Sequence, residues 1–276
     1  MASAVVNDVE LFFETTGSGE RLVLVHGSWG DATSWRAVVG PLADRFEVVT
    51  WDRRGHSRSN GGTGQGSLRQ DADDLAALIE HLGETPAHVV GNSYGGSVTL
   101  TLVAARPDLV ASAAVHEPPL FDSLDDLDAE AAAELARTDR GLAVVVDLLE
   151  AGDAEGAARQ FVDGVAFGPG RWDRLPDAEQ EIFVRNAPTF LDECRDPAGL
   201  SLDVTALAAS AVPMLLTRGT ESPAAFRAVI DGLAALAPHA EVRVLDGAGH
   251  VTHWTHPADL VSALLAFHDR LEGSGR

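Results

Sequence analysis

The amino-acid sequence predicts an α/β fold, in which a mostly parallel sheet is covered by helices on both faces. The chain has 276 residues, of which 45% are hydrophobic and 22% are charged, as in a globular protein. Short runs of Val, Leu and other apolar residues recur along the sequence, at the length of buried strands. Segments with apolar residues at helical spacing separate many of these runs, and this alternation favours a parallel sheet.

Six of the apolar runs are expected to form strands of this sheet, because each is short and rich in β-branched or other apolar residues. They lie at residues 21–25, 46–51, 87–90, 109–115, 214–217 and 241–245. Amphipathic spacing predicts three helices, at residues 71–82, 93–105 and 257–271. Proline marks two helix limits: Pro107 stops the second helix, and Pro257 starts the third, where its missing N–H does no harm.

Residues 118–209 interrupt the alternation, since they contain almost no strand-like run. They are rich in Ala, Asp, Glu and Arg at helical spacing. We therefore expect a core formed by residues 1–117 and 210–276, into which residues 118–209 are inserted as a helical lid. In open α/β sheets the ligand binds beyond the carboxyl ends of the strands, so an insertion at this point would cover the pocket.

The charge balance excludes several classes of partner. The chain has 20 Arg, no Lys and 42 Asp plus Glu, which gives a formal net charge of −22. Binding to nucleic acid requires cations that replace the counterions of the phosphates, and an anionic membrane surface would be repelled in the same way. We expect no nucleic-acid or membrane partner, and a small-molecule substrate that is neutral and partly apolar.

Cysteine usage and the first residues bear on the compartment. Cys194 is the only cysteine, so the chain cannot form an internal disulfide. Residues 1–10 lack the basic flank and apolar core of a signal peptide, and no apolar run approaches the roughly 18 residues of a membrane span. We therefore expect a cytoplasmic protein. A homodimer is compatible with the sequence but is not indicated by it.

The strongest chemical signal is Gly91-Asn92-Ser93-Tyr94-Gly95, between a predicted strand and a predicted helix. A Gly-x-Ser-x-Gly turn in this context exposes the serine hydroxyl on a sharp bend, where the glycines avoid collisions with neighbouring backbone. The amino end of the following helix brings its positive dipole end to the hydroxyl. Ser93 is therefore the predicted nucleophile.

A serine hydroxyl needs a general base, and position favours His250 among the ten histidines. His250 ends a glycine-rich loop that follows the last predicted strand and precedes the last helix. His253 and His256 follow at intervals of three, which raises the alternative of a metal cluster. Zinc-binding histidines on a helix are normally four residues apart with a glutamate partner, so this loop fits poorly. We expect no metal and no organic cofactor.

Together with two further segments, these motifs resemble the α/β-hydrolase superfamily over nearly the whole chain. The segments are His26-Gly27, after the first predicted strand, and residues 52–59, whose pattern departs from the usual one at Ser57, where glycine is common. The resemblance implies the α/β-hydrolase fold, with a helical lid inserted after the sixth strand of that fold. In this sequence the sixth strand of the fold corresponds to the run at 109–115. Epoxide hydrolases and haloalkane dehalogenases of this superfamily carry Asp at the elbow, so Ser93 disfavours both reactions.

The resemblance also implies an oxyanion hole. One donor would be the backbone N–H of Tyr94, and the second would be the N–H of Ser28 or, alternatively, of Trp29. Such donors often contribute about 3 kcal/mol each to stabilisation of the transition state. Trp29 and Trp172 are also candidates for the apolar wall of a substrate pocket.

The acid that orients His250 has two candidates. In most relatives it follows a glycine that closes a late strand, but here that position is occupied by Ser222, with Glu221 just before it. Glu117 follows the strand after the elbow helix, in a His-Glu-Pro segment that is similar to lactone hydrolases of the zearalenone-degrading kind. Because a triad is defined by geometry rather than sequence position, both remain open and Glu117 is favoured.

These residues predict a serine hydrolase that cleaves a carboxylic ester or lactone of a small molecule through an acyl-enzyme. The lactonase interpretation rests on the resemblance around Glu117 alone. The same constellation would also suit an acyltransferase or cyclase, a cofactor-free perhydrolase or a C–C bond hydrolase. A non-catalytic small-molecule receptor that keeps the triad is the alternative outside enzymes.

Overall fold

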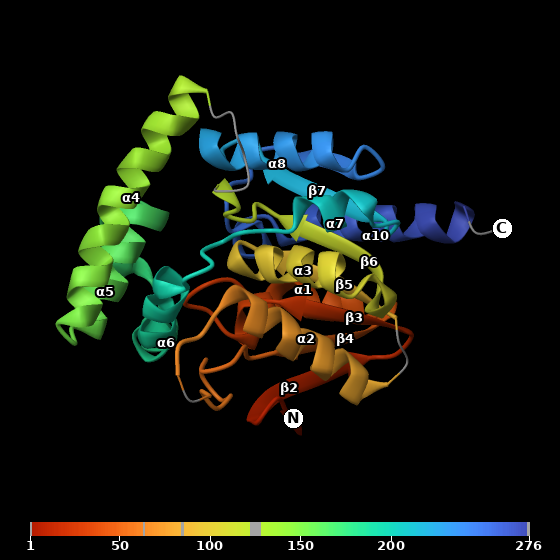
Figure 1. Cartoon of the computed structure of the whole chain (residues 1–276), viewed down its shortest axis with the longest axis horizontal. Helices are drawn as coiled ribbons and strands as arrows, with labels where there is room; N and C mark the ends of the chain where they lie inside the picture. Colours follow the sequence, from red (N-terminus) through yellow and green to blue (C-terminus); the bar gives the residue numbers. More distant parts are fainter. Residues whose placement is uncertain (1, 63, 84–85, 122–127, 275–276) are drawn as a thin grey trace.

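The structure, a computed structural model, describes residues 2–62, 64–83, 86–121 and 128–274. An eight-stranded sheet in the order β1-β2-β4-β3-β5-β6-β7-β8 forms its centre (Figure 1). The strands are β1 (Ala2–Val6), β2 (Val9–Gly17), β3 (Glu20–Val25), β4 (Phe46–Trp51), β5 (Ala87–Asn92), β6 (Val110–His116), β7 (Met214–Gly219) and β8 (Glu241–Leu245). The pairs from β4 to β8 are all parallel, which confirms the predicted fold class.

All six predicted strands are present with ends within two residues of those expected, whereas the hairpin of β1 and β2 was not predicted. These two strands pair antiparallel to each other, and β2 pairs antiparallel to β4. The turn between them is Asn7-Asp8, both with positive φ, a conformation that Asn and Asp adopt more readily than most residues. Buried and exposed side chains alternate around this turn, so the hairpin signal was present in the sequence.

Helices cover both faces of the sheet. One face carries α1 (Arg36–Ala43) and α10 (Pro257–Ser274). The other carries α2 (Leu68–Leu82), α3 (Tyr94–Ala105), α7 (Val204–Ala209) and α8 (Ala224–Leu236). The remaining short elements are η1 (Ala32–Trp35), η2 (Pro107–Leu109) and α9 (Thr252–Thr255).

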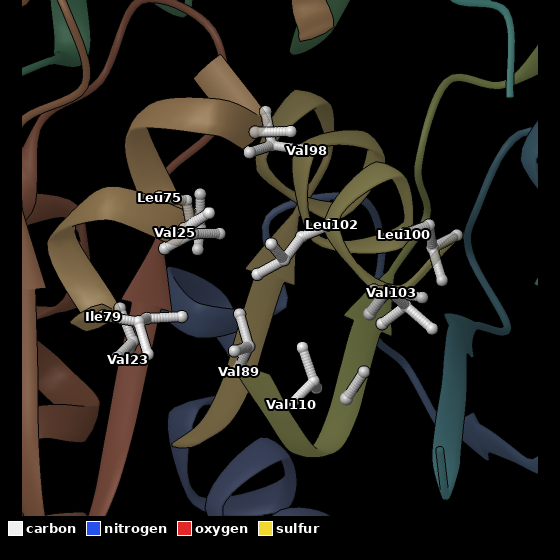
Figure 2. Packing of buried hydrophobic residues seen from close by; sticks show 14 of the residues in the cluster. Val23, Val25, Leu75, Ile79, Val89, Val98, Leu100, Leu102, Val103 and Val110 are labelled. Atoms are coloured by element: carbon white, nitrogen blue, oxygen red, sulfur yellow. The ribbon is translucent and has the colours of Figure 1, made fainter. Parts of the chain in front are cut away.

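The layer between the sheet and α2 and α3 is the larger part of the core. Figure 2 shows it as branched aliphatic side chains from both layers: Val23, Val25, Val89 and Val110 from the strands, and Leu75, Ile79, Val98, Leu100, Leu102 and Val103 from the helices. Each buried side chain of this size contributes roughly 1.5–3 kcal/mol relative to an exposed one. This packing fixes β5 and α3, the two elements that flank Ser93.

The inserted region is helical in its described part and lies at one side of the core in Figure 1. It contains α4 (Ala129–Glu150), α5 (Ala154–Gln160), the π-helical turn η4 (Phe161–Ala166), η5 (Trp172–Arg174) and α6 (Asp177–Arg195). Residues 122–127 of the predicted lid lie outside the described residues. Helix α7, although within the predicted range 118–209, packs against α3 and α8 of the core.

Two further properties of the described residues concern the cysteine and the apolar length of the helices. Cys194 is exposed and forms no disulfide. No helix among the described residues is both long and apolar enough to cross a membrane.

Candidate active site

Ser93 lies at the turn between β5 and α3, with a backbone φ of 55° and ψ of −129°. Its N–H donates to the carbonyl oxygen of His116 at 2.9 Å, which anchors the turn to the neighbouring strand. A β carbon at Gly91 would lie 2.2 Å from the carbonyl oxygen of Gly95, and one at Gly95 would lie 2.2 Å from that of Val25. Both glycines are therefore required by close backbone approach.

We expect Gly95→Ala to lower the free energy of unfolding by at least about 2 kcal/mol, because the new methyl group collides with backbone that cannot move freely. Denaturant unfolding measures this change. Gly40→Ala is the matched control, since its β carbon meets no atom within 4 Å and its helical position should gain up to about 1 kcal/mol. Equal stability of the two variants would contradict the geometry described for the turn.

His250 is held beside this turn by two contacts. Its Nδ1 lies 2.9 Å from Oε2 of Glu117, and the Asn92 side-chain amide donates to its carbonyl oxygen at 3.1 Å. The imidazole also stacks on Phe226, with ring centroids 4.3 Å apart. Because the ionised Glu117 accepts a hydrogen bond from the Nδ1–H of His250, the other ring nitrogen is left as the proton acceptor.

Glu117 is fully buried and is held by several donors at once. Its Oε1 accepts hydrogen bonds from the N–H of Gly219, at 3.0 Å, and from the hydroxyl of Ser222. Burial alone would raise the pKa of Glu117, but the hydrogen bond from His250 and the proximity of His116 lower this pKa to about 2. Glu117 is therefore a carboxylate at neutral pH, as an acid that stabilises an imidazolium must be.

Of the two predicted acids, the structure places only Glu117 at His250. The Glu221 side chain is exposed, and its backbone N–H donates to Ala248. Ser222, which occupies the acid position usual in relatives, is turned inward and donates to Glu117 instead. The expectation that the longer side chain of Glu221 reaches the histidine is corrected, because that side chain points to solvent.

The predicted oxyanion donors lie on two backbone segments that meet at Ser93. Tyr94 opens α3, so its N–H has no acceptor within the helix. A β carbon on Gly27 would lie 3.1 Å from Cβ of Ser93, which places the loop containing Ser28 and Trp29 against Ser93. Neither Ser28 nor Trp29 donates its backbone N–H to another described residue. The role of these amides as oxyanion donors stays a prediction.

The two tryptophans predicted to line a pocket are both buried in the apolar cluster of the inserted helices. Trp29 has no exposed surface and packs on Phe161 and Phe190, with centroids 4.8 and 4.9 Å apart. Trp172 is 2% exposed and meets Phe183 edge-on. The structure corrects the assignment of Trp29 and Trp172 to a pocket wall, because both rings fill the interior of this cluster.

Two polar residues of α6 that sequence reasoning missed hold the loops of the site. Asn186 donates to the carbonyl of Gly30 at 2.8 Å and accepts from the N–H of Ser57 at 2.7 Å. Glu193 accepts from the Arg53 guanidinium at 2.6 Å and from the Ser28 hydroxyl. No local pattern marks these residues, since their partners lie more than a hundred positions away.

We expect Asn186→Ala to lower the free energy of unfolding by about 3 kcal/mol, because it removes a fully buried side chain and leaves partly buried backbone groups of two loops without that partner. Turnover should fall as well, since the displaced loop carries the predicted oxyanion donor. Denaturant unfolding and an ester assay measure the two effects. Arg185→Ala, an exposed position on the same helix, should change neither.

His250, His253 and His256 do not bring their ring nitrogens together, and the metal-ligand group found within the described residues contains none of them. His250 contacts Glu117, His256 contacts Thr255, and His253 is buried against Trp35 at a centroid distance of 4.8 Å. Burial, followed by the nearby His116 and His250, lowers the pKa of His253 to about 3.

This shift makes stability dependent on pH. Between about pH 3 and pH 6.5 the unfolded chain protonates residue 253 and the folded chain does not, so stability falls as pH falls through this window. We expect His253→Leu to reduce the slope of unfolding free energy against pH by up to about 1.4 kcal/mol per unit. Denaturant unfolding from pH 4 to pH 7 measures the slope, and an unchanged slope would contradict a neutral buried imidazole.

Comparisons with known proteins give a consistent result. The sequence profile of the alpha/beta hydrolase family matches residues 22–264. The 2-(acetamidomethylene)succinate hydrolase of Mesorhizobium japonicum is 26% identical over 276 residues, which cover 96% of this chain and 93% of that protein. A solved alpha/beta hydrolase from Sphaerobacter thermophilus DSM 20745 has a TM-score of 0.76 and 26% identity, covering 97% of this chain and 100% of the other.

Other relatives match over shorter segments. The uncharacterized hydrolase YraK of Bacillus subtilis is 37% identical over 121 residues, 43% of this chain and 45% of that protein. The chain thus spans less than half the length of several curated relatives that it matches.

Proposed function

The chain belongs to the alpha/beta hydrolase family, and from the arrangement of Ser93, His250 and Glu117 we propose that it is a serine hydrolase of carboxylic esters or lactones. The observation that carries this proposal is the 2.9 Å contact between His250 Nδ1 and the buried Glu117 carboxylate, beside a serine on a strained turn. A neutral imidazole in this setting is a general base, and a serine hydroxyl is the group that it activates.

The proposed reaction has two halves. Ser93 Oγ attacks the carbonyl carbon while the second ring nitrogen of His250 takes the hydroxyl proton, and Glu117 stabilises the resulting imidazolium. The negative oxygen is held by the N–H of Tyr94 and that of Ser28 or Trp29. His250 then protonates the leaving alcohol, and a water molecule, activated by the same imidazole, cleaves the acyl-enzyme.

Separate observations bear on the charge and on the size of the proposed substrate. The net charge of −22 slows the approach of anions. We further propose that α4, α5 and α6 form a lid over the site, since α6 contacts the loops that carry Ser28 and Ser57. The full-length relative from Mesorhizobium japonicum is named as a 2-(acetamidomethylene)succinate hydrolase, which supports the small size. Because a succinate is an anion, the proposal of an uncharged substrate rests on the net charge of this chain alone.

A turnover assay tests the proposal and its alternatives. The purified chain is given p-nitrophenyl esters and lactones of graded size, with water alone or with an added alcohol or hydrogen peroxide. We expect ester or lactone cleavage with water as the acceptor. Faster product formation with the alcohol or the peroxide would indicate a transferase or a perhydrolase, and no turnover of any substrate would favour a receptor.

A further inference from the structure

Three side chains that the proposed chemistry does not use converge at the amino-terminal end of the sheet. Glu20 is the first residue of β3, His88 lies in the adjacent strand β5, and His268 lies on α10. His268 Nε2 lies 2.9 Å from Glu20 Oε2 and 3.3 Å from His88 Nε2. The remaining distance, from His88 Nε2 to Glu20 Oε2, is 3.5 Å.

These separations match the edges of a tetrahedral metal site. With zinc–nitrogen and zinc–oxygen bonds of about 2.0–2.1 Å, adjacent ligand atoms lie about 3.3 Å apart. We propose that Glu20, His88 and His268 bind one divalent transition-metal ion, best fitted by zinc, with solvent as the fourth ligand. A donor set of two imidazoles and one carboxylate is suited to zinc.

The surroundings orient both imidazoles toward the common point. His88 Nδ1 lies 2.7 Å from the hydroxyl of the buried Ser112, so a proton on Nδ1 leaves the Nε2 lone pair free. His268 Nδ1 makes no hydrogen bond to the described residues, and the nearest carboxylate oxygen given for it, from Glu272, lies 3.6 Å away. Phe46 packs edge-on against both rings, which limits their rotation. Burial, followed by the nearby His268, lowers the pKa of His88 and favours the neutral form that a metal requires.

An entry path and a protected interior are both present. The Glu20 side chain is 66% exposed, whereas those of His88 and His268 are 12% and 7% exposed. An ion can therefore arrive from solvent at the carboxylate and be held against the two imidazoles.

The position assigns this site a structural role rather than a catalytic one. His88 and Ser93 lie in and just after the same strand, five residues apart, which corresponds to about 16 Å along β5. A bound ion would join β3 and β5 to the C-terminal helix α10. This inference is independent of the proposed hydrolase function.

Metal titration of the chelator-treated full chain tests the site. We expect one equivalent of Zn²⁺ to bind, an increase in Tm on binding, and a Co²⁺ form with the visible absorption of tetrahedral cobalt. Glu20→Gln and His268→Gln should each weaken Zn²⁺ binding at least tenfold and remove the metal-dependent increase in Tm. His81→Gln, at an exposed histidine on α2, is the control and should bind as the wild type does.

Two results would overturn the proposal. One is the absence of stoichiometric Zn²⁺ binding to the wild type at 100 μM metal. The other is unchanged Zn²⁺ binding by Glu20→Gln. This variant is expected to fold normally because the Glu20 side chain is exposed, so its result decides the matter even if His268→Gln fails to fold. The variant His250→Ala distinguishes binding at the proposed site from binding at His250. It should still bind one equivalent of Zn²⁺.

Discussion

Ser93→Ala should lower kcat for ester hydrolysis by about 10⁴-fold or more, the order of loss seen when a triad nucleophile is removed. The reason is chemical, since no other described hydroxyl lies on the turn that faces His250 and the predicted oxyanion donors. Initial rates with a p-nitrophenyl ester measure the effect. The free energy of unfolding should stay within about 1 kcal/mol of wild type, because only one half-buried hydroxyl is removed.

Ser97→Ala is the matched control for this experiment. Ser97 lies one turn further along α3, is fully buried, and its hydroxyl has no hydrogen-bond partner in the described structure. Removing that hydroxyl should leave kcat unchanged. Comparable activity of Ser93→Ala and wild type would refute Ser93 as the nucleophile, and equal losses in the two variants would indicate damage to α3 rather than to chemistry.

Glu117→Gln should lower kcat by about 10⁴-fold, the scale found when the triad carboxylate of a serine protease becomes an amide. The amide cannot stabilise an imidazolium, and its N–H₂ can donate to Nδ1 and so favour the wrong tautomer of His250. Size is conserved, so the contacts with Gly219 and Ser222 can adapt with little change in packing. The measurement is kcat with the same ester.

Glu221→Gln provides the contrast, since the Glu221 carboxylate is exposed and does not contact His250 in the described structure. It should retain nearly all activity. The double variant Ser93→Ala, Glu117→Gln should be no slower than Ser93→Ala alone, because the members of a triad act as one unit. A larger loss in Glu221→Gln than in Glu117→Gln would transfer the acid role to Glu221.

The sequence predicted the turn at Ser93 because its determinants are local. A strand, a helix and two glycines within five residues specify this bend, and close backbone contacts account for both glycines. The six strands were also predicted, since each is a short run rich in β-branched or other apolar residues. The β1–β2 hairpin was missed because its alternation of buried and exposed residues is weaker than a continuous apolar run.

The choice of acid could not be made from the sequence. Glu117 and His250 are 133 positions apart, and only the pairing of β6 with β7 brings Glu117 over Gly219 and Ser222. The sequence favoured Glu117 but left Glu221 open, because the exposure of Glu221 is a tertiary property. Long-range contacts of this kind depend on where strands end relative to one another, which apolar patterns do not specify to one residue.

The roles predicted for the aromatic residues were wrong for a related reason. An apolar ring in an inserted helix packs equally well in a pocket or in the interior of the insertion, and Trp172 is in the interior. Asn186 and Glu193 gave no signal, because polar residues on an amphipathic helix are ordinarily exposed. Their contacts with the loops of Gly30 and Arg53 appear only once α6 is placed.

The most direct test of the account is to locate a covalent adduct. The wild-type chain is treated with a fluorophosphonate and digested, and the modified peptide is identified by mass spectrometry. The account predicts one adduct, on Ser93, that forms far more slowly in Glu117→Gln and is absent from Ser93→Ala. An ester-hydrolysing wild type that carries its adduct on another residue, or labels equally fast in Glu117→Gln, would contradict a serine activated by the His250–Glu117 pair.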